Sequence, residues 1–585
     1  MSAQTIPHTD RLGAKPATSP VRGLPGWTMA IPLAILAVAA FLPVLDNGFV
    51  NLDDDANFLY NPHYRGLGRA QLAWAWTTEW LGVYQPLAWI LLETEYTVFG
   101  LDPRGYHLTS VVLSVLSALV LYALTLALLN RAHPELRSVN PTGVVLGSAL
   151  AVALFVAHPL RVEVVAWASC QPYLPTATMA MLAVVTYLGA ADASPRRRAL
   201  GLIGAWVLFA VALLFKAVAV TLPAVLIVLD YYPLRRLGGG RGGWFGPAAR
   251  RVWAEKVPFV ALSAVFAVLA IRAKEASHSL VTLERHGPLS RIAQACYGAD
   301  FYLWKTVWPT GLCAYYSAPM QFDWRSPTYL ACAALVATVS VALFLLRRRH
   351  PGLLAAWLAY LVILSPNSGL VTLGNQIAAD RYSYLATMSV VPLLAAAVAR
   401  LTRSGHSRVA IRSVVFPLGL ALVAALVVSS RGLCQTWRDT VTLASYALDQ
   451  GGPDPDLYLG LGWGLEQRDD FAGAEASFCE ALRLDPLYVP AMVKLGMIRL
   501  RRGRLDNAIT LLTEANRLQP GTPEMHNTLG TALAARGRLD EAIAEFTVAL
   551  RLWPDFAEAR KNLVHVLSRA GKGRSLSKSP PSARS

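Results

Sequence analysis

The chain has 585 residues, of which 54% are hydrophobic and only 15% charged, and its mean hydropathy is +0.40. Soluble domains carry about 25% charged residues, and here the apolar residues cluster in blocks of roughly 17 to 24, the length that crosses a bilayer. This composition excludes a soluble enzyme, a disordered chain and a collagen-like fibre. The net charge of +16 is compatible with nucleic-acid binding, but the simpler explanation is an excess of basic residues in the cytoplasmic loops of a membrane protein.

An apolar run begins at Trp27, after the polar residues 1–26. Because no small-residue cleavage site follows this run, we interpret it as a retained first helix and not as a signal peptide. Eleven membrane-spanning helices are predicted in all: 27–45, 107–130, 142–158, 173–191, 199–215, 216–232, 256–271, 328–346, 352–366, 382–401 and 412–430. The predicted fold is therefore all-α, with a polytopic membrane domain over 27–431.

Basic residues indicate the orientation of these helices. If the N-terminus is cytoplasmic, the inside segments hold 20 Lys and Arg in 84 residues, whereas the outside segments hold 11 in 146 residues. The inside segments are 1–26, 131–141, 192–198, 233–254, 347–351 and 400–412. The outside segments are 46–106, 159–172, 272–327 and 367–381. This difference has the direction of the positive-inside rule. With an odd number of spans, everything after residue 431 is expected outside the cytoplasm.

The aromatic segment 294–312 contains Asp300 and Lys305. Counting it as a span would put the Arg347–Arg349 cluster outside, so we predict an interfacial helix with Trp304 and Trp308 at headgroup level.

A 34-residue period appears after residue 452. It holds in four registers over three copies: Pro486, Pro520 and Pro554; Gly462, Gly496 and Gly530; Ala474, Ala508 and Ala542; Ala481, Ala515 and Ala549. This is the tetratricopeptide pattern, in which small residues mark the contact between two antiparallel helices and proline ends the second. We predict a linker over 432–452, repeats over 453–486, 487–520 and 521–554, a partial cap over 555–570, and a disordered basic tail over 571–585. Such arrays bind proteins or peptides.

Three consecutive carboxylates, Asp53, Asp54 and Asp55, open the long first outside loop, 46–106. Like charges so close raise one another's pKa, which suits a general base with an orienting or metal-binding partner. A helix N-cap followed by a solvated turn is the structural alternative. The same loop carries five aromatic residues that favour an interfacial position, Trp74, Trp76, Trp80, Tyr84 and Trp89.

Four outside junctions present charged or polar groups at span ends. These are HPLRVEVVAW with His158, Arg161 and Glu163; FKAVAVTLP with Lys216; YLWKTVWPTG with Lys305; and NQIAADRYSYL with Asp380 and Arg381. Taken singly, each is typical of snorkelling or of a salt bridge. Together with the acidic loop they form the set of groups needed to hold a lipid phosphate while a base activates an acceptor.

The order of these motifs resembles that of the transmembrane and tetratricopeptide-repeat-containing proteins, which are related to protein O-mannosyltransferases among the polytopic type C glycosyltransferases. The similar elements cover about residues 27–570: the acidic pair, NP, YxPL, FGLxxxGYHL with His107, HPxRVEVVAW, the Lys before TLP, FYLWKTxWPTGL, DRYxYL, TWRD and the repeats. The resemblance implies a donor sugar carried by polyprenyl phosphate and catalysis by the acidic pair, here Asp53 and Asp54. This chain departs from the family pattern at Gln85, Ser110, Ser114 and Ala217.

The leading hypothesis is therefore a glycosyltransferase that moves a sugar, such as mannose, from polyprenyl phosphate to Ser or Thr of a protein on the non-cytoplasmic face. Asp53 would be the base and Asp54 would orient the acceptor or bind a metal, while Arg381, Lys305, Arg161 and Lys216 would neutralise the phosphate. Asp55, His158, Glu163 and His107 are further candidates for the site. The repeats would present the acceptor protein.

Two other classes of function remain open. A non-enzymatic scaffold would use its spans as an anchor and recruit partners through its repeats, whereas a transporter is disfavoured because few charges lie within the spans. Six cysteines without Cys-x-x-Cys spacing predict neither a zinc site nor a disulfide framework: Cys170, Cys296, Cys313, Cys332, Cys434 and Cys479. The C-terminal PPSARS is no eukaryotic retention signal, so we expect a bacterial inner membrane.

Overall fold

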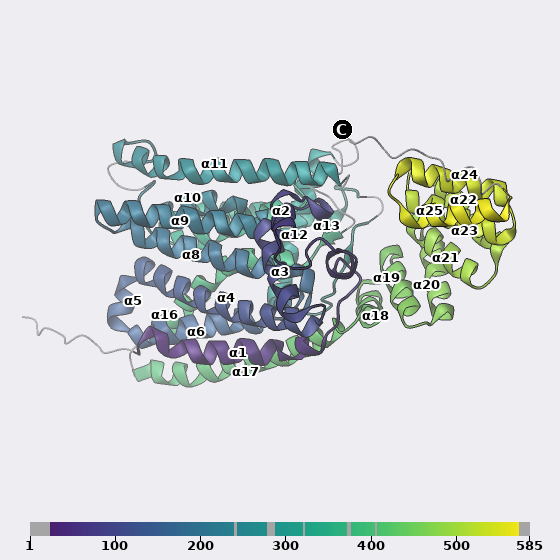
Figure 1. Ribbon diagram of the computed structural model, residues 1–585. Coiled ribbons are helices and arrows are strands. Elements are labelled where there is room, and N and C mark those ends of the chain that lie inside the picture. The colour runs from purple at the N-terminus through teal and green to yellow at the C-terminus, as the bar shows by residue number, and fades with distance from the viewer. Residues whose placement is uncertain are drawn as a thin grey trace, which may run out of the picture.

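The computed structural model describes residues 24–238, 243–277, 287–319, 322–370, 376–403 and 406–571. Long helices form a bundle, and shorter helices of the C-terminal part stack at one end of it (Figure 1). We call this the repeat-facing end of the bundle, and the other the opposite end. The predicted N-terminal tail up to residue 23 and the basic tail from 572 lie outside the described residues.

Most bundle helices begin with proline, which lacks the N–H that a first helical turn leaves unpaired. The long ones are α1 (Ala30–Phe41), α4 (Pro103–Ala132), α6 (Pro141–Ala157), α8 (Tyr173–Ala191), α9 (Pro195–Phe215), α10 (Leu222–Tyr231), α11 (Pro247–Ala276), α13 (Pro327–Leu345), α14 (Pro351–Leu364), α16 (Val391–Leu401) and α17 (His406–Thr436). Shorter or peripheral ones are α2 (Arg69–Thr77), α3 (Pro86–Phe99), α5 (Pro134–Val139), α7 (Val162–Ala166), α12 (Pro288–Val307) and α15 (Ser383–Ala386).

Eight helical segments among the described residues are long and apolar enough to cross a membrane: Gly26–Asp46, Pro103–Ala132, Ala168–Ala191, Pro195–Phe215, Pro247–Ala276, Pro327–Arg348, Asp380–Leu401 and Arg412–Thr436. A ninth would be Pro141–Ala157 with Pro159–Ala166, which are bent by 65°. The two remaining predicted spans coincide with the shorter apolar helices Ala217–Tyr231 and Pro351–Asn367. Each predicted span thus falls on an apolar helix, and the count of eleven crossings stays a prediction.

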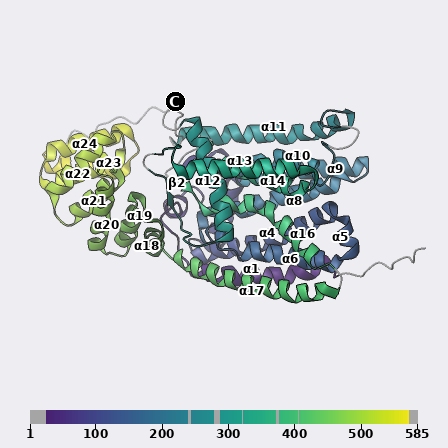
Figure 2. The ribbon, with the colours of Figure 1, turned by 180° about the vertical axis from the view of Figure 1, so that it is seen from behind.

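The outer helices of the bundle expose the most apolar surface. No residue is buried in the apolar window of Pro327–Arg348, and only 17% are buried in those of Pro247–Ala276 and Arg412–Thr436. Figure 2 shows α13 on the near face, with α11 and α17 along opposite edges. Exposed apolar surface of this extent is what a lipid environment would cover. The interfacial position predicted for 294–312 also stays a prediction: α12 ends within this segment, and Trp304 and Trp308 are 62% and 59% exposed.

The repeats form an array of antiparallel helix pairs: α19 (Pro455–Gln467) with α20 (Phe471–Leu484), α21 (Val489–Arg501) with α22 (Leu505–Leu518), α23 (Pro523–Arg536) with α24 (Leu539–Leu552), and α25 (Ala557–Arg569). The periodic glycines lie where paired helices touch. A Cβ at Gly462 would lie 2.5 Å from Phe478, and one at Gly530 would lie 2.8 Å from Phe546. The predicted role of the small residues is confirmed.

The predicted linker 432–452 is helical and not an extended connection. Helix α17 continues to Thr436, and α18 (Thr440–Gly451) packs on α19. A Cβ at Gly464 would lie 2.9 Å from Val441, so α18 covers the first repeat as a further helix of the array. The sequence hid this helix because it lacks the periodic residues of the repeat.

Candidate functional site

The first outside loop lies against the segment that leads into the repeats. Three hydrogen bonds join them: Asn47 Nδ2 to the Cys434 carbonyl at 3.0 Å, Gly48 N to the Arg438 carbonyl at 2.8 Å, and Asn51 N to Thr440 Oγ1 at 2.9 Å. The acidic residues and the base of the repeats are therefore held at the same end of the bundle. The segment 434–440, which contains the TWRD motif (Thr436 to Asp439), holds this loop in place.

Asp53 is the exposed member of the acidic triplet. The protein around it nevertheless raises the pKa of its carboxyl by desolvation, and the positive charges of Arg381 and Lys216 oppose this rise. Asp53 is thus both accessible and close to two cations from distant parts of the sequence.

Asp54 is 1% exposed and its oxygens are occupied by protein donors. Oδ1 accepts hydrogen bonds from Ser169 N at 2.9 Å and Ser169 Oγ at 2.5 Å, while Oδ2 accepts one from Val50 N at 3.0 Å. Burial raises its pKa to about 7, although these hydrogen bonds lower it. The geometry gives Asp54 the task of bracing the loop against the 168–170 turn, instead of contacting an acceptor.

Asp55 is the buried acidic residue whose carboxyl is affected by a charge from the repeats. It is 6% exposed and begins a single wide helical turn, Asp55–Leu59. Burial raises the pKa of its carboxyl, and the charge of Lys494, in the second repeat, lowers it. Lys494 itself lies 4.2 Å from the centre of the Trp463 ring and 3.3 Å from a carboxylate oxygen of Glu466. Lys494 thus joins the first helices of repeats one and two, and its charge acts on the acidic loop.

Arg381 and Glu163 form a nearly buried ion pair beside Asp53. The guanidinium bonds Glu163 Oε1, and the Arg381 backbone N–H donates to Oε2 at 2.6 Å. The other guanidinium nitrogen donates to Gln376 Oε1 at 3.1 Å, and the side chain lies over the rings of Trp167 and Tyr382. Arg381 is 14% exposed at its side chain and Glu163 only 2%. Glu163 is thus the counter-ion that orients Arg381.

The other predicted cations lie in different settings. Lys216 is partly buried, with its ammonium 5.0 Å from the Tyr173 ring centre. Lys305 donates to the carbonyls of Thr310 and Gly311 at 2.5 and 3.2 Å. Arg161 is 2% exposed, donates to Ser383 Oγ at 3.2 Å and lies over Phe155. Of the predicted cations, Arg381 and Lys216 are the pair whose charges act on Asp53.

The two histidines predicted for the site, His158 and His107, make hydrogen-bond contacts with backbone groups of the protein. His158 is 7% exposed; Nδ1 accepts from Leu160 N at 3.2 Å and Nε2 lies 3.1 Å from the Thr306 carbonyl. His107 is fully buried, with Nε2 3.5 Å from the Gly48 carbonyl. Both therefore tie helices to neighbouring loops and are remote from solvent.

Sequence reasoning missed several polar residues of this end. Glu95 Oε1 accepts from Gln171 Nε2 at 2.9 Å, and burial raises the pKa of Glu95 to about 7. Ser169, two residues before Gln171, holds Asp54, and the charge of Lys274 also acts on Asp53. The sequence did offer one sign of these residues, because Ser169 and Gln171 are polar residues in an otherwise apolar turn.

Of the five aromatic residues predicted to lie at an interface, Trp89 is buried, which corrects the prediction for this residue, whereas the other four keep exposed or partly exposed surface. Trp89 is 1% exposed and its ring centre lies 4.8 Å from that of Trp74. Both belong to a cluster with Phe58, Tyr64 and Tyr106. Trp76, 46% exposed, remains compatible with an interface. Periodicity cannot distinguish an aromatic core from an aromatic surface, because both use the same rings.

A partly open apolar groove begins within one helical turn, along the chain, of Lys216 and Arg381. Its cavity volume is about 190 Å³, and its lining is almost entirely apolar. Val218 and Ala219 of this lining follow Lys216, Leu385 lies one helical turn after Arg381, and Ala177 lies one turn after Tyr173. From there the groove follows α10 and α14 to Tyr232 and Gly352 at the opposite end. We call it the apolar groove.

A two-stranded sheet links Arg381 to the repeats. Strand β1 (Tyr316–Ser317) pairs antiparallel with β2 (Gln376–Ala378), and Tyr316 OH donates to Asp380 Oδ1 at 2.8 Å. The preceding residue, Tyr315, donates to Asp456 Oδ2 of the first repeat at 2.5 Å. Adjacent tyrosines therefore hold the repeat on one side and the residue before Arg381 on the other.

No group of three or more His, Cys, Asp or Glu side chains in the described part of the chain is arranged to hold a metal ion. Asp53 is the carboxylate of the acidic triplet with exposed surface. It could contribute one oxygen to a cation, whereas the oxygens of Asp54 are already engaged by protein donors.

Comparisons with known proteins bear on the C-terminal part. A family model described as tetratricopeptide repeat matches residues 459–523 and 493–557. No curated protein sequence matches the chain.

Among solved structures, a mutant O-GlcNAc transferase of Thermobaculum terrenum is 28% identical over 19% of this chain, with a TM-score of 0.19. The chain spans only 22% of that protein's length. MamA of Desulfovibrio magneticus RS-1 is 19% identical over 23% of this chain and 76% of its own length, with a TM-score of 0.22. Residues 459–557 are thus tetratricopeptide repeats, a module for protein–protein interaction, joined to a bundle with several helices apolar enough for a membrane.

Proposed function

We propose that this protein is a membrane glycosyltransferase that transfers a sugar from a polyprenyl-phosphate donor to a Ser or Thr hydroxyl of a protein. Asp53 takes the proton of the acceptor hydroxyl, whose oxygen then bonds to C1 of the sugar. The bond between C1 and the phosphate oxygen breaks, and the lipid phosphate leaves as an anion. Arg381 and Lys216 stabilise that anion by charge-assisted contacts.

The observation that carries this proposal is the accessible carboxylate of Asp53 beside the charges of Arg381 and Lys216. A general base works best with a pKa near the operating pH, and desolvation raises the pKa of Asp53 in that direction. Opposite charges at the same place suit a reaction in which a proton is removed while a phosphate departs.

The apolar groove supports a lipid-linked donor. Its lining begins within one helical turn of Lys216 and Arg381, so a lipid with its phosphate at these cations would place its chain in the groove. Burying an isoprenoid chain is favourable by about 0.8 kcal/mol for each CH₂-sized group. A soluble nucleotide sugar would make no use of such a groove.

The repeats supply the acceptor in this proposal. Lys494 and Trp463 belong to the first helices of the repeats, and the charge of Lys494 acts on Asp55, so a peptide held there reaches the acidic loop directly. We assign eleven crossings to the bundle, with the N-terminus in the cytoplasm and the repeats in the periplasm. A periplasmic reporter fused after residue 452 should then be active and a cytoplasmic one silent; the reverse result would mean that one span is miscounted.

The transferase activity can be tested with purified full-length protein and labelled polyprenyl-phosphate sugars, by following labelled protein and released sugar. We expect Asp53→Asn to lose roughly 10² to 10⁴ of the rate without a change in thermal stability. Asp46→Asn is the matched control, since Asp46 is an exposed carboxylate of the same loop, 81% exposed at its side chain. Turnover that Asp53→Asn leaves intact would remove Asp53 from the mechanism.

A non-enzymatic scaffold is the second candidate function, and the tetratricopeptide match favours it. In that case the bundle anchors the repeats and the repeats recruit a partner. Purified protein would then give no turnover with any lipid-linked sugar, while a partner captured through the repeats would bind equally well to the Asp53→Asn protein.

A further inference from the structure

The lining of the apolar groove reaches the opposite end of the bundle. There it includes His133, Tyr232 and Gly352, which begin or end the helices around it. We call these three residues, together with Arg235 and Arg400, the opposite mouth.

Two exposed arginines flank the opposite mouth. One guanidinium nitrogen of Arg400 lies 2.9 Å from His133 Nε2, and the charges of Arg400 and Arg235 both act on His133 and on Tyr232. The backbone holds Arg235 in the left-handed region, with φ of 53°, which L residues rarely adopt. Glu135, 62% exposed at its side chain, bonds the other ring nitrogen of His133 and is the acidic group of this mouth.

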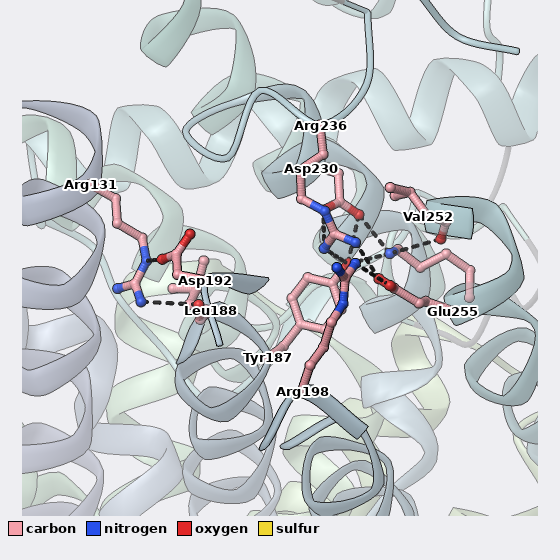
Figure 3. Close-up of polar contacts among 10 residues, drawn as sticks. Arg131, Tyr187, Leu188, Asp192, Arg198, Asp230, Arg236, Val252 and Glu255 are labelled. Carbon is pink, nitrogen blue, oxygen red and sulfur yellow. Dashed lines mark hydrogen bonds and ion pairs between the residues drawn. The ribbon is translucent and has the colours of Figure 1, made fainter. Parts of the chain in front are cut away.

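Three other arginines at the same end are bonded to protein groups, as Figure 3 shows. Arg131 bonds Asp192 and the Leu188 carbonyl, while Arg198 and Arg236 both bond Glu255. Arg235 and Arg400 differ from these three because they are exposed and their charges act on His133 and Tyr232 of the groove lining.

We propose that the opposite mouth is a second lipid-phosphate site, which binds the phosphate of a polyprenyl lipid whose chain enters the apolar groove from the cytoplasmic leaflet. The class of lipid rests on the proposed function, but the site does not depend on catalysis. One groove then accepts the same carrier with its phosphate at either end.

The shape of the groove favours a single-chain lipid over a phospholipid with two acyl chains. Alanines recur along its walls at Ala177, Ala180, Ala355, Ala359 and Ala396, and these small side chains leave more room for one lipid chain than larger apolar residues would. An anionic head at the mouth gains charge-assisted hydrogen bonds from Arg400 and Arg235. The sugar-free lipid phosphate, which is the product of the proposed transfer, has both features.

The site can be mapped with polyprenyl phosphate that carries a photoactivatable diazirine beside the phosphate. Full-length protein in phosphatidylcholine nanodiscs is irradiated with this probe, and the labelled peptides are identified by mass spectrometry. We expect labelling of 129–140, 230–238 or 396–403 in addition to 170–175 and 381–386. The double variant Arg235→Gln/Arg400→Gln should lose the opposite-end labelling by roughly ten-fold or more and keep the labelling near Arg381.

Arg196→Gln/Arg197→Gln removes two exposed charges from the same end, away from the groove, and should leave both patterns unchanged. Labelling confined to 170–175 and 381–386 would overturn the second site while leaving the proposed transferase intact. Opposite-end labelling in a protein without transferase activity would support the site and count against the enzyme. Equal labelling by a diazirine phosphatidylglycerol would overturn the polyprenyl assignment and show a general phospholipid site.

Discussion

The two ends of the helix bundle use buried charges in different ways. At the opposite end, Asp230 is completely buried; it forms ion pairs with Lys256 at 2.6 Å and Arg236 at 3.1 Å and accepts a hydrogen bond from Tyr187 OH at 2.7 Å (Figure 3). At the repeat-facing end, Arg381 and Glu163 are similarly paired, but Asp53 beside them remains exposed. The network around Asp230, which we call the closed network because its charges are buried and paired, joins helices. A network that leaves one carboxylate exposed, as Asp53 is, can also take part in a reaction.

Removing a charge from the closed network should have the largest effect on stability. Lys256 is 2% exposed, so Lys256→Met leaves Asp230 with one cation fewer in a buried site. Breaking a buried pair costs about 3–5 kcal/mol, and we expect a loss of unfolding free energy of that order. Thermal unfolding in detergent measures it, with Arg197→Gln as the exposed control at the same end. A loss below about 1 kcal/mol would place this network with ordinary surface pairs.

The pH dependence of stability should report the burial of Asp54. Because folding raises the pKa of Asp54 from 3.8 to about 7, the folded state binds this proton more tightly than the unfolded state. The contribution of Asp54 to stability is therefore greatest below pH 3.8 and is lost as the pH rises toward 7. Each pKa unit corresponds to about 1.4 kcal/mol.

Asp54→Asn should flatten this part of the stability profile, as measured by denaturant unfolding between pH 4 and pH 8. Asp46→Asn, in the same loop but exposed, should retain the original slope. Identical slopes in both variants would mean that Asp54 keeps the same pKa in the folded and unfolded chains.

Arg381→Lys tests whether the repeat-facing pair binds a ligand. Lysine keeps the charge that Glu163 requires but loses the planar, bidentate geometry of arginine. We expect expression and stability to be retained, while the affinity for a polyprenyl-phosphate sugar falls roughly ten- to a hundred-fold, or about 1.5–3 kcal/mol. Arg381→Ala should also destabilise the protein, because it leaves Glu163 buried without a partner. Unchanged donor affinity in the lysine variant would make Arg381 a purely structural residue.

The smallest expected effect concerns the connection between the repeats and the site. Tyr315→Phe removes the hydrogen bond to Asp456, worth about 1.5 kcal/mol for a charged acceptor. Faster hydrogen exchange in 455–467 and in 376–378 would show that both sides of the connection loosen together. Tyr60→Phe, at a tyrosine that is 62% exposed, is the control. Faster exchange in the repeats alone would mean that they dock without supporting Arg381.

The sequence predicted the elements with strong periodicity. The 34-residue spacing of Gly462, Gly496 and Gly530 located the paired helices because close helix contact leaves no room for a larger side chain. The apolar blocks located the long helices because each must cover its backbone polar groups internally. Helix α18 was missed because its packing on α19 uses Val441 and Thr440 against Gly464 without any repeat signature.

The site was only partly accessible to the same reasoning. Charge and proximity in sequence singled out Asp53, Asp54 and Asp55 as one group, but they could not rank its members. The three have different surroundings: the charge of Arg381 acts on Asp53, the Ser169 turn holds Asp54, and the charge of Lys494 in the repeats acts on Asp55. Neighbouring side chains in a tight turn point in different directions, so their environments depend on segments far away in the chain.

The sequence by itself determined the class of the molecule, the positions of its long helices and the repeat array, since these follow from local periodicity and composition. The tertiary structure decided which charged side chains are buried in ion pairs and which remain exposed. Glu163 and Arg381 are 218 residues apart in the sequence, and Asp54 and Ser169 are 115 residues apart. Such pairs form only when helix packing brings their ends together, and no local pattern encodes the depth at which each side chain then lies.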